Sequence, residues 1–520
     1  MWALGCQWDC EHVSAGSQTR MRRCVVRHRL ADVLRKRVFW RDAGGPNRLS
    51  SSGVSNSQSP VFHRRSGALF VEGVRLSSLL SPAAQASGVA TPFFVYSREQ
   101  LQRDFARYTQ AAESLSVDLG TPPLVAFAVK ANPSRALLTL LHGWGAGATV
   151  VSAGELALVR SVGISGDKVL LHGNGKRSTD IDAALEIDAL LSIDSEFDVQ
   201  HVQARARALG RTARILLRVN PNIDPQVHPY ISTGLLESKF GMAEASIERL
   251  RPSLRALSRS SAGVPAISLR GLHCHLGSTL KSGQPVLDAA RQLLPLLSKL
   301  REDGHPIDTL DLGGGLGIDY SHRRGAPAAP DPAELMAGLR LILQRQANDP
   351  PLRLWLEPGR SIVGPCGALV GRVIGVKHRS GEVAAADSTG ERSFLCTDAS
   401  MAQLIRPSLY GAYHHIELLE EPDPSADAQL RLYDVVGPIC ESGDFIGQKR
   451  LLPTPAEGDG LIIYDTGAYG AAMSSRYNLH FHCAEYLIDG THVTRIRKAE
   501  TFEDFARSFV DEPLPAAEEP

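Results

Sequence analysis

"LVAFAVKANP" (residues 124–133) is the first of eight segments with the same design, and it begins as a buried strand that ends on Lys130. Each of the eight is short and mostly apolar, and most of them end in Gly, Asn, Ser or a charged residue, as strands commonly do. The strands predicted in this way are residues 124–130, 148–153, 168–174, 189–194, 214–220, 269–278, 309–317 and 352–360.

Helix-type patterns such as "DAARQLLPLLSKLRED" lie between the predicted strands. Alternation of strands and helices implies a parallel sheet. Eight strands over roughly 240 residues is the size of a (β/α)₈ barrel, and a doubly wound open sheet is the alternative. The reactive groups of such a barrel gather at the C-terminal ends of its strands. This sequence places there Lys130, His275, Ser278, the Gly313–Gly315 run, Glu357 and Arg360.

The sequence pattern changes after about Gly364: segments such as "RLYDVVGPICESGDF" are rich in strand-forming residues and contain frequent turn residues. This change indicates a second domain. We therefore expect a barrel over residues 96–364 and an all-β domain over residues 365–508. Residues 67–95, which include "ALFVEGVRLSSLL", are expected to pair with the β domain. The tail, residues 509–520, is acidic and proline-rich, so we expect it to be disordered.

The first 66 residues are basic, with 12 Lys and Arg against 4 Asp and Glu, a net charge of +8. They are rich in Arg and Ser and lack the continuous apolar core of a secretory signal, which favours an organelle transit peptide. The alternatives are a disordered N-terminal extension and a start codon placed too early. Composition alone does not distinguish a plastid from a mitochondrion.

The formal net charge of the whole chain is zero, which argues against a nucleic-acid or membrane-surface partner. No run of about 18 apolar residues is present, so we expect no membrane-spanning helix. The eight cysteines are scattered without a CxxC pair, and neither a zinc site nor a disulfide framework is indicated. A reducing compartment is the simpler assumption.

Two histidines in "GLHCHLGS", His273 and His275, lie on the same side of a predicted strand. Two such histidines could bind a metal ion, but no conveniently placed third Cys or His accompanies them, so we predict no metal. We interpret His275 as a residue stacked on a flat cofactor ring and His273 as a core histidine.

The glycine run in "DLGGGLG" follows the seventh predicted strand. Consecutive glycines leave backbone N–H groups accessible to an anion, and many barrels bind a phosphate after strands seven and eight. Arg360, at the end of strand eight, could add a guanidinium fork. A glycine run alone is more often a tight turn, and its pairing with Arg360 favours phosphate binding.

Lys130 alone would be interpreted as an end-of-strand lysine that reaches toward water. In a desolvated barrel mouth, however, a lysine amine is nucleophilic and can form a Schiff base. A phosphate site, a lysine and the Glu357 carboxylate together match the needs of pyridoxal phosphate: an anchor, an aldehyde partner and a partner for the ring nitrogen. The sequence therefore favours pyridoxal 5'-phosphate as the cofactor.

The segment "GPICESGDF" holds Cys440 and Glu441 between turn-forming glycines. A loop position suits function better than core packing. Cys440 could donate a proton and Glu441 could bind a cationic group of a substrate, although spacing alone is a weak signal for both.

Together these motifs resemble the diaminopimelate decarboxylases, which catalyse the last step of lysine biosynthesis, and among them the plant and algal plastid type. The resemblance covers residues 68–508. It rests on "FAVKAN", "VSAGEL", "GNGK", "LLRVNPNIDPQVHPYISTGLLESKFG", "GLHCHLGST", "LGGGLGIDY", "EPGRSIV", "MAQLIRPSLYGAYHHIEL", "VVGPICESGDF", "DTGAYGAAMSSRYN" and "AETFEDF".

The resemblance implies a barrel of the alanine racemase type with a C-terminal β domain, and a head-to-tail homodimer with shared active sites. It assigns the Schiff-base lysine to Lys130 and the proton donor, contributed by the other subunit, to Cys440. The cofactor-binding positions that it implies are Lys130, His275, Ser278, Gly314, Gly315, Glu357, Arg360 and Tyr469. The substrate-binding positions that it implies are Arg360, Arg406, Tyr410, Glu441 and Tyr469.

The activity implied by the resemblance is decarboxylation of meso-2,6-diaminopimelate to L-lysine and carbon dioxide, in a plastid. An ornithine-type decarboxylase is the nearest alternative, but its substrate has no distal carboxylate for Arg406 to bind. An alanine racemase relative would face the ring nitrogen with an arginine instead of Glu357. A non-catalytic regulator that binds the cofactor is not supported, because Lys130 and Cys440 are both present.

Overall fold

The computed structural model describes residues 60–224, 234, 238–258, 266–322, 328–344, 351–378, 393–422 and 430–512. The expected transit peptide therefore lies outside the described residues except for residues 60–66. The expected disordered tail lies outside them except for residues 509–512. No helix among the described residues is long and apolar enough to cross a membrane.

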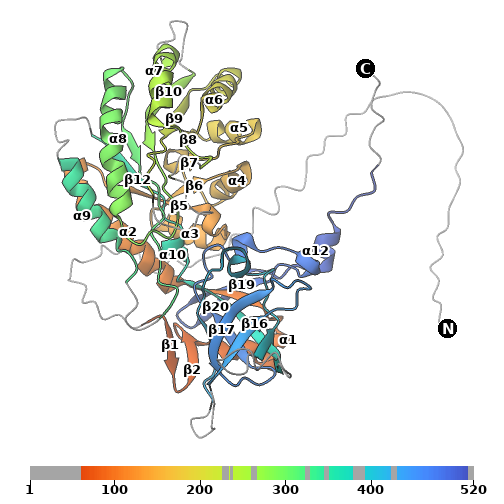
Figure 1. Cartoon of the computed structure of the whole chain (residues 1–520). Coiled ribbons are helices and arrows are strands. Elements are labelled where there is room, and N and C mark those ends of the chain that lie inside the picture. The colour runs from red at the N-terminus through yellow and green to blue at the C-terminus, as the bar shows by residue number, and fades with distance from the viewer. Residues whose placement is uncertain are drawn as a thin grey trace, which may run out of the picture. The chain divides into compact units, whose positions relative to one another are not determined.

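Eight parallel strands form a closed barrel in the order β10-β11-β12-β5-β6-β7-β8-β9 (Figure 1). The strands are β5 (Leu124–Ala128), β6 (Gly147–Val150), β7 (Val169–Leu171), β8 (Leu190–Ile193), β9 (Ala213–Arg218), β10 (Ile267–His273), β11 (Thr309–Asp311) and β12 (Arg353–Leu356). Each overlaps one predicted strand, so the (β/α)₈ barrel is confirmed and the open-sheet alternative is wrong.

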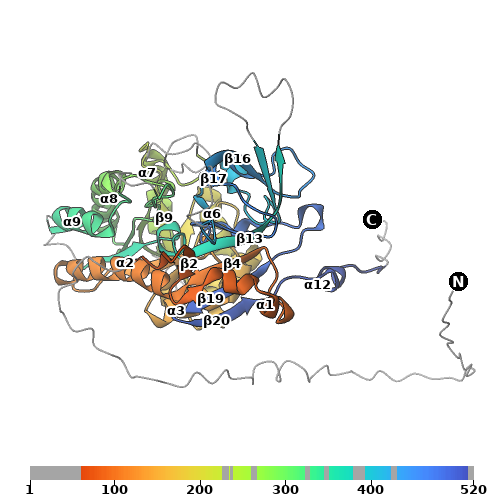
Figure 2. The same ribbon diagram turned by 90° about the horizontal axis from the view of Figure 1, so that it is seen from below.

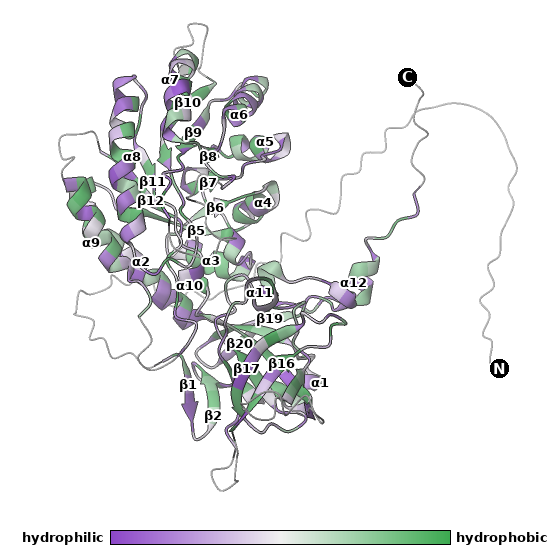
Figure 3. Cartoon of the chain, in the orientation of Figure 1, coloured by the Kyte–Doolittle hydropathy of each residue, from purple (hydrophilic) through white to green (hydrophobic). Residues whose placement is uncertain are grey.

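Helices surround this barrel (Figures 1 and 2). They are α2 (Arg98–Leu119), α3 (Arg135–Gly143), α4 (Ala153–Ser161), α5 (Ser178–Glu186), α6 (Glu196–Ala208), α7 (Glu244–Ser258), α8 (Gln284–Glu302) and α9 (Pro332–Leu343). Figure 3 shows apolar and polar faces on these helices. On α8, for example, Leu293, Leu297 and Leu300 are buried at helical spacing.

The barrel interior is filled with side chains. A separate core cluster consists of Ala126, Leu170, Leu190, Leu216 and Trp355, one residue from each of five strands. All five are buried. A filled barrel leaves the loops at its C-terminal end as the place for a binding site.

A nine-stranded sheet forms the β domain, and its main path is β17-β16-β14-β13-β4-β19-β20, with β15 and β18 beside it (Figure 2). Its strands are β4 (Phe93–Ser97), β13 (Gly367–His378), β14 (Ser393–Thr397), β15 (Ile416–Leu418), β16 (Leu430–Val436), β17 (Phe445–Pro453), β18 (Gly460–Ile463), β19 (Ala484–Asp489) and β20 (His492–Arg497). The short helices α10 (Arg360–Val363), α11 (Arg406–Tyr410) and α12 (Phe502–Ala506) occur in the same half of the chain.

The strand that joins the N-terminal part of the chain to the β domain is β4, which pairs antiparallel with β13 and parallel with β19. Its sequence "FFVYS" is buried at every position, as a central strand requires. Residues 62–75, in contrast, form a small sheet of their own, β1 (Phe62–Arg65), β2 (Ala68–Val71) and β3 (Val74–Arg75). That sheet meets the β domain at an antiparallel bridge between Ala68 and Glu420.

The contact between β10 and β11 is so close at Gly271 that a Cβ atom there would lie 1.7 Å from the Thr309 carbonyl oxygen. We predict that Gly271→Ala lowers the free energy of unfolding by about 3 kcal/mol, because neither backbone can move without breaking the barrel. Thermal unfolding measures the effect. Gly375→Ala in β13 is the matched control, since its Cβ would meet nothing within 4 Å. Equal melting temperatures for the two variants would contradict the prediction.

Candidate active site

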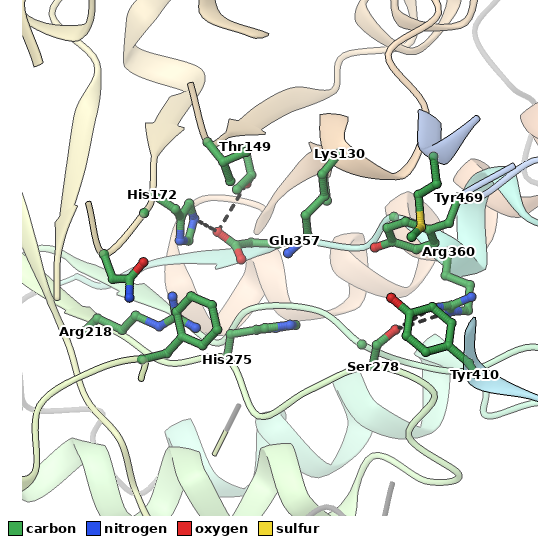
Figure 4. A pocket seen from close by; sticks show the side chains of 18 of the residues that line it. Lys130, Thr149, His172, Arg218, His275, Ser278, Glu357, Arg360, Tyr410 and Tyr469 are labelled. Atoms are coloured by element: carbon green, nitrogen blue, oxygen red, sulfur yellow. Dashed lines mark hydrogen bonds and ion pairs between the residues drawn. The ribbon is translucent and has the colours of Figure 1, made fainter. Parts of the chain in front are cut away.

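A cavity of about 420 Å³ lies at the C-terminal ends of the barrel strands (Figure 4). Barrel strand ends, α11 and the loop after β18 all contribute to it. The lining residues are Ala128, Lys130, Thr149, Val151, His172, Gly173, Asn174, Arg218, Phe240, His275, Ser278, Gly315, Glu357, Gly359, Arg360, Arg406, Tyr410, Tyr469 and Met473.

Most residues singled out from the sequence meet in this pocket: Lys130, His275, Ser278, Gly315, Glu357, Arg360, Arg406, Tyr410 and Tyr469. Gly314 lies beside it, and its N–H donates to His275 Nδ1 at 3.3 Å. Cys440 and Glu441 do not line the pocket and are exposed. A single chain thus assembles the site without the thiol and without the second acidic group.

Lys130 follows β5 in a short 3₁₀ turn, Val129–Ala131. The β domain holds this turn: Tyr469 N donates to Ala131 O at 2.8 Å, and Asn132 Nδ2 donates to Gly467 O at 2.9 Å. The lysine is exposed, so the desolvation expected from the sequence is absent in one chain, because the pocket mouth is open to solvent. Within the described residues, no hydrogen bond or ion pair engages Lys130 Nζ.

Lys176 lies in the same region of the barrel, but its ammonium group is already paired with a carboxylate. Its Nζ lies 2.5 Å from Asp198 Oδ2 and 2.7 Å from Gly173 O, and both charged side chains are almost fully buried. Breaking such a pair would leave an unpaired buried charge. Lys130 is therefore the better candidate for a reactive amine.

The Glu357 carboxylate is fixed by neighbours from two other strands. His172 Nε2 lies 2.5 Å from Glu357 Oε1, and Thr149 Oγ1 donates to the same oxygen at 3.2 Å. Burial alone would raise the pKa of Glu357, but the neighbouring histidines and the hydrogen bond from His172 lower this pKa well below its ordinary value. The carboxylate is therefore ionised at neutral pH.

Asp311, at the end of β11, has the opposite protonation. Burial, followed by the charge of Glu357, raises the pKa of Asp311 well above its ordinary value, so this carboxyl group holds its proton. One oxygen, Oδ1, accepts from Gly313 N at 2.7 Å and shapes the start of the glycine turn. The two acids thus carry one negative charge between them, on Glu357.

The prediction of no metal rested on the absence of a third Cys or His near His273 and His275. That reason was wrong, because the fold brings His172 beside His273. Ligand atoms of His172, His273 and Glu357 lie within 4.8 Å of one another. However, two ligands of a tetrahedral zinc ion are roughly 3.4 Å apart, given bonds of about 2.1 Å. The 2.5 Å between His172 and Glu357 is a hydrogen-bond distance. In this arrangement His172 is hydrogen-bonded to the Glu357 carboxylate and holds it in place.

At the other end of the pocket, Arg360 is buried among neutral partners. Its Nε and Nη2 donate to Ser278 Oγ at 3.2 and 3.1 Å, and its Nη1 donates to Tyr320 Oη at 2.5 Å. The guanidinium carbon lies 4.7 Å from the centre of the Tyr469 ring.

Arg406 is buried beside it and is also held by neutral groups. Its guanidinium carbon lies 4.8 Å from the centre of the Tyr320 ring, and its Nη1 lies 2.7 Å from His414 Nε2. Neither arginine forms an ion pair with a carboxylate in the described part of the chain. A buried cation without a counter-charge is unfavourable, so this end of the pocket is suited to anionic groups.

The glycine turn lines the same pocket as these arginines and packs against Gly277, the residue before Ser278. Gly315 has φ +108°, and a Cβ atom there would lie 2.0 Å from the Gly277 carbonyl oxygen, so only glycine fits. The turn, Ser278 and Arg360 together make a cradle of donors that is open to a compact anion.

Sequence reasoning missed the supporting residues Thr149, His172, Tyr320 and His414. Thr149 and His172 lie within the predicted strands 148–153 and 168–174, and Tyr320 closes the quoted motif "LGGGLGIDY". Their positions near strand ends were a usable signal, but their partners were not visible in the sequence.

Known proteins resemble this chain over nearly its whole length. The family model "Pyridoxal-dependent decarboxylase, pyridoxal binding domain" matches residues 99–364. A "Probable diaminopimelate decarboxylase, chloroplastic" of Oryza sativa subsp. japonica is 38% identical over 487 residues, which is 93% of this chain and 92% of the rice protein.

Solved structures agree with this similarity. Diaminopimelate decarboxylase from M. jannaschii in complex with L-lysine superposes with a TM-score of 0.76 at 31% identity, covering 86% of this chain and 98% of that one. The enzyme from Helicobacter pylori, also complexed with L-lysine, gives a TM-score of 0.71 at 30% identity, covering 82% of this chain and 98% of that one.

Proposed function

Because the chain belongs to the diaminopimelate decarboxylase family, we propose that it converts meso-2,6-diaminopimelate to L-lysine and carbon dioxide with pyridoxal 5'-phosphate as cofactor. The observation that carries this proposal is one pocket with three features. These are the amine of Lys130, the fixed carboxylate of Glu357, and the two buried arginines Arg360 and Arg406. Among the residues that the structure describes, the amine has no hydrogen-bond or ion-pair partner and the arginines have no carboxylate beside them.

The residues present fit pyridoxal phosphate. Glu357 and Arg360 lie at opposite ends of the pocket, and Lys130 extends between them (Figure 4). Arg360, Ser278 and the glycine turn are suited to the phosphate, and Glu357 to the ring nitrogen. Bound pyridoxal phosphate supplies an aldehyde that condenses with amines and a ring that accepts the electron pair left by a departing carboxylate.

His275 provides a neutral surface beside Lys130. Burial, followed by the charge of Lys130, lowers the pKa of His275 well below its ordinary value. Its Nδ1 accepts from Gly314 N, so in the neutral ring the proton is on Nε2. We assign to this ring the stacking role expected from the sequence, because a neutral imidazole adds no charge next to a lysine amine.

The substrate's second end carries both a carboxylate and an ammonium group. Arg406 is suited to that carboxylate, since its guanidinium lines the pocket without an ion-pair partner in the described chain. Tyr410 and Tyr469 line the same end and offer hydroxyl groups. Glu441 is the complement of the ammonium group.

Cys440 and Glu441 reach the pocket only if a second copy of the chain brings them. Both are exposed, and they lie on one face with Tyr477 and Leu479, which are 43% and 54% exposed. Cys440 N donates to Asn478 Oδ1 at 2.8 Å, which joins the two segments. We assign this face to a homodimer with shared sites, in which Cys440 of the partner subunit gives a proton to the carbon that has lost its carboxylate.

The proposal predicts that the purified protein, supplied with pyridoxal phosphate, releases lysine and carbon dioxide from meso-diaminopimelate and does not decarboxylate L-ornithine. Lys130→Ala should lower the turnover by at least ~1000-fold, because the amine that engages the cofactor is lost. For the wild type and the variant, amino-acid analysis measures the lysine formed and a gas assay measures the carbon dioxide released. Lys168→Ala, at the other end of the barrel, is the control. Full cofactor absorbance without turnover of meso-diaminopimelate would contradict the proposal.

Shared sites predict complementation between inactive variants. Lys130→Ala and Cys440→Ala subunits are each inactive alone, but one site of a mixed dimer contains both Lys130 and Cys440. Random mixing should restore about a quarter of the wild-type activity, since half of the dimers are mixed and each has one intact site. Subunit exchange followed by an activity assay measures this.

The matched control mixes Lys130→Ala with Arg360→Ala. Both changes are on the barrel side, so neither site of the mixed dimer is intact, and activity should stay absent. No recovery with Cys440→Ala, despite mixed dimers detected by native mass spectrometry, would show that Cys440 does not act across subunits.

We also propose a plastid location, supported by the basic, Arg-rich and Ser-rich first 66 residues and by the chloroplastic name of the rice relative. A fusion of residues 1–66 to a fluorescent protein should enter plastids. A fusion with the Arg and Lys residues of this segment changed to Gln should remain outside. Import into mitochondria, or no import, would contradict the location.

A further inference from the structure

His414 is a direct polar partner of Arg406, and it is fully buried. Its Nδ1 lies 2.8 Å from the backbone carbonyl oxygen of Tyr464, and its Nε2 lies 2.7 Å from Arg406 Nη1. A carbonyl oxygen only accepts, so Nδ1 carries the proton. An arginine only donates, so Nε2 is the unprotonated acceptor.

These two bonds are compatible only with a neutral ring. Burial, followed by the charge of Arg406, lowers the pKa of His414 to about 3, in agreement with the geometry. The ring also packs against Tyr320 in a T-shaped contact, with ring centres 5.2 Å apart. His414 therefore offers one acceptor in a fixed place.

The other groups that interact with Arg406 in the described part of the chain are neutral or positive: the tyrosines Tyr320 and Tyr469, and Arg360. The Tyr320 ring covers its guanidinium, and Arg360 shares the same tyrosine. Aspartate or glutamate at position 414 would orient Arg406 equally well. Such a carboxylate would also neutralise the positive charge of Arg406, which a ligand carboxylate needs.

We propose that His414 is a positioning and specificity-determining residue: it fixes Arg406 in the pocket through a neutral acceptor and so leaves the full guanidinium charge to the distal carboxylate of the substrate. This inference rests on the proposed function and deepens it. It predicts selection of amino acids with a carboxylate at the far end, since a substrate without that carboxylate gains nothing from Arg406.

Two ligands and three variants test the proposal in the holoenzyme. L-lysine keeps the distal carboxylate, and pentane-1,5-diamine lacks it. His414→Leu removes the acceptor, His414→Gln keeps a neutral acceptor with a donor beside it, and His414→Glu supplies a charged acceptor. Each variant is checked first for wild-type cofactor absorbance and melting temperature.

His414→Leu should raise the KM for meso-diaminopimelate and the inhibition constant of L-lysine at least tenfold. It should change kcat less than about threefold, because distal binding is uniform between ground and transition states. Inhibition by pentane-1,5-diamine should stay unchanged. His414→Gln should remain within about threefold of the wild type in every value.

His414→Glu separates positioning from charge, because it should lose L-lysine inhibition as strongly as His414→Leu although it can still hold Arg406. L-lysine inhibition equal to that of the wild type in His414→Leu or in His414→Glu would overturn the proposal. Equal losses for L-lysine and pentane-1,5-diamine would overturn it too, since they would indicate a structural role. Failure of the proposed function is distinguishable, because the wild type would then not convert meso-diaminopimelate.

If one variant fails to fold, the other two variants still test the role of His414. Calorimetric binding of L-lysine and pentane-1,5-diamine to the folded holoenzyme gives the same comparison without turnover. A wild-type preference for L-lysine that persists in the surviving Leu or Glu variant would count against the role of His414.

Discussion

The site depends on a separation of charge along one pocket. At one end a single negative charge is fixed on Glu357 by His172 and Thr149, while Asp311 behind it stays protonated. At the other end two buried arginines are held by neutral groups. Such a distribution is unfavourable in an empty pocket and favourable around a ligand with a cationic ring and anionic ends. We infer that recognition of such a ligand depends on the charges that the described part of the chain leaves unpaired.

The β domain takes part in building this pocket. Its loop after β18 holds the Lys130 turn through the hydrogen bond from Tyr469 N to Ala131 O. Tyr469 has φ +59°, a left-handed conformation that is uncommon for a bulky residue. The same residue places its ring against Arg360. The backbone conformation at Tyr469 thus connects the position of the lysine with that of the arginine.

Much of the barrel could be predicted from the sequence because each strand is a short apolar run with a polar end. The same rule located Lys130, His275, Ser278, Glu357 and Arg360, which stand where those runs end. Local pattern could not reveal His172 as the partner of Glu357, since the two are 185 positions apart in the chain. The parallel barrel brings them together only after it closes.

Residues 67–95 were expected to pair with the β domain, but no strand was predicted at β4, because its partners β13 and β19 lie far along the chain. The expectation of a desolvated Lys130 was wrong for a single chain, since solvent access depends on what covers the pocket mouth. Tyr320 and His414 were missed because the contacts that single them out are with other side chains, Arg360 and Arg406. Their roles follow from contact geometry, which no residue pattern contains.

The most direct test of the account is to find which lysine carries the cofactor. The purified protein with bound pyridoxal phosphate is reduced with borohydride, digested, and its peptides are analysed by mass spectrometry. We predict the added phosphopyridoxyl mass on the peptide that contains Lys130, the lysine that lines the pocket. The added mass on Lys176 or another lysine would contradict the account. So would the absence of any modified lysine in a protein that binds the cofactor.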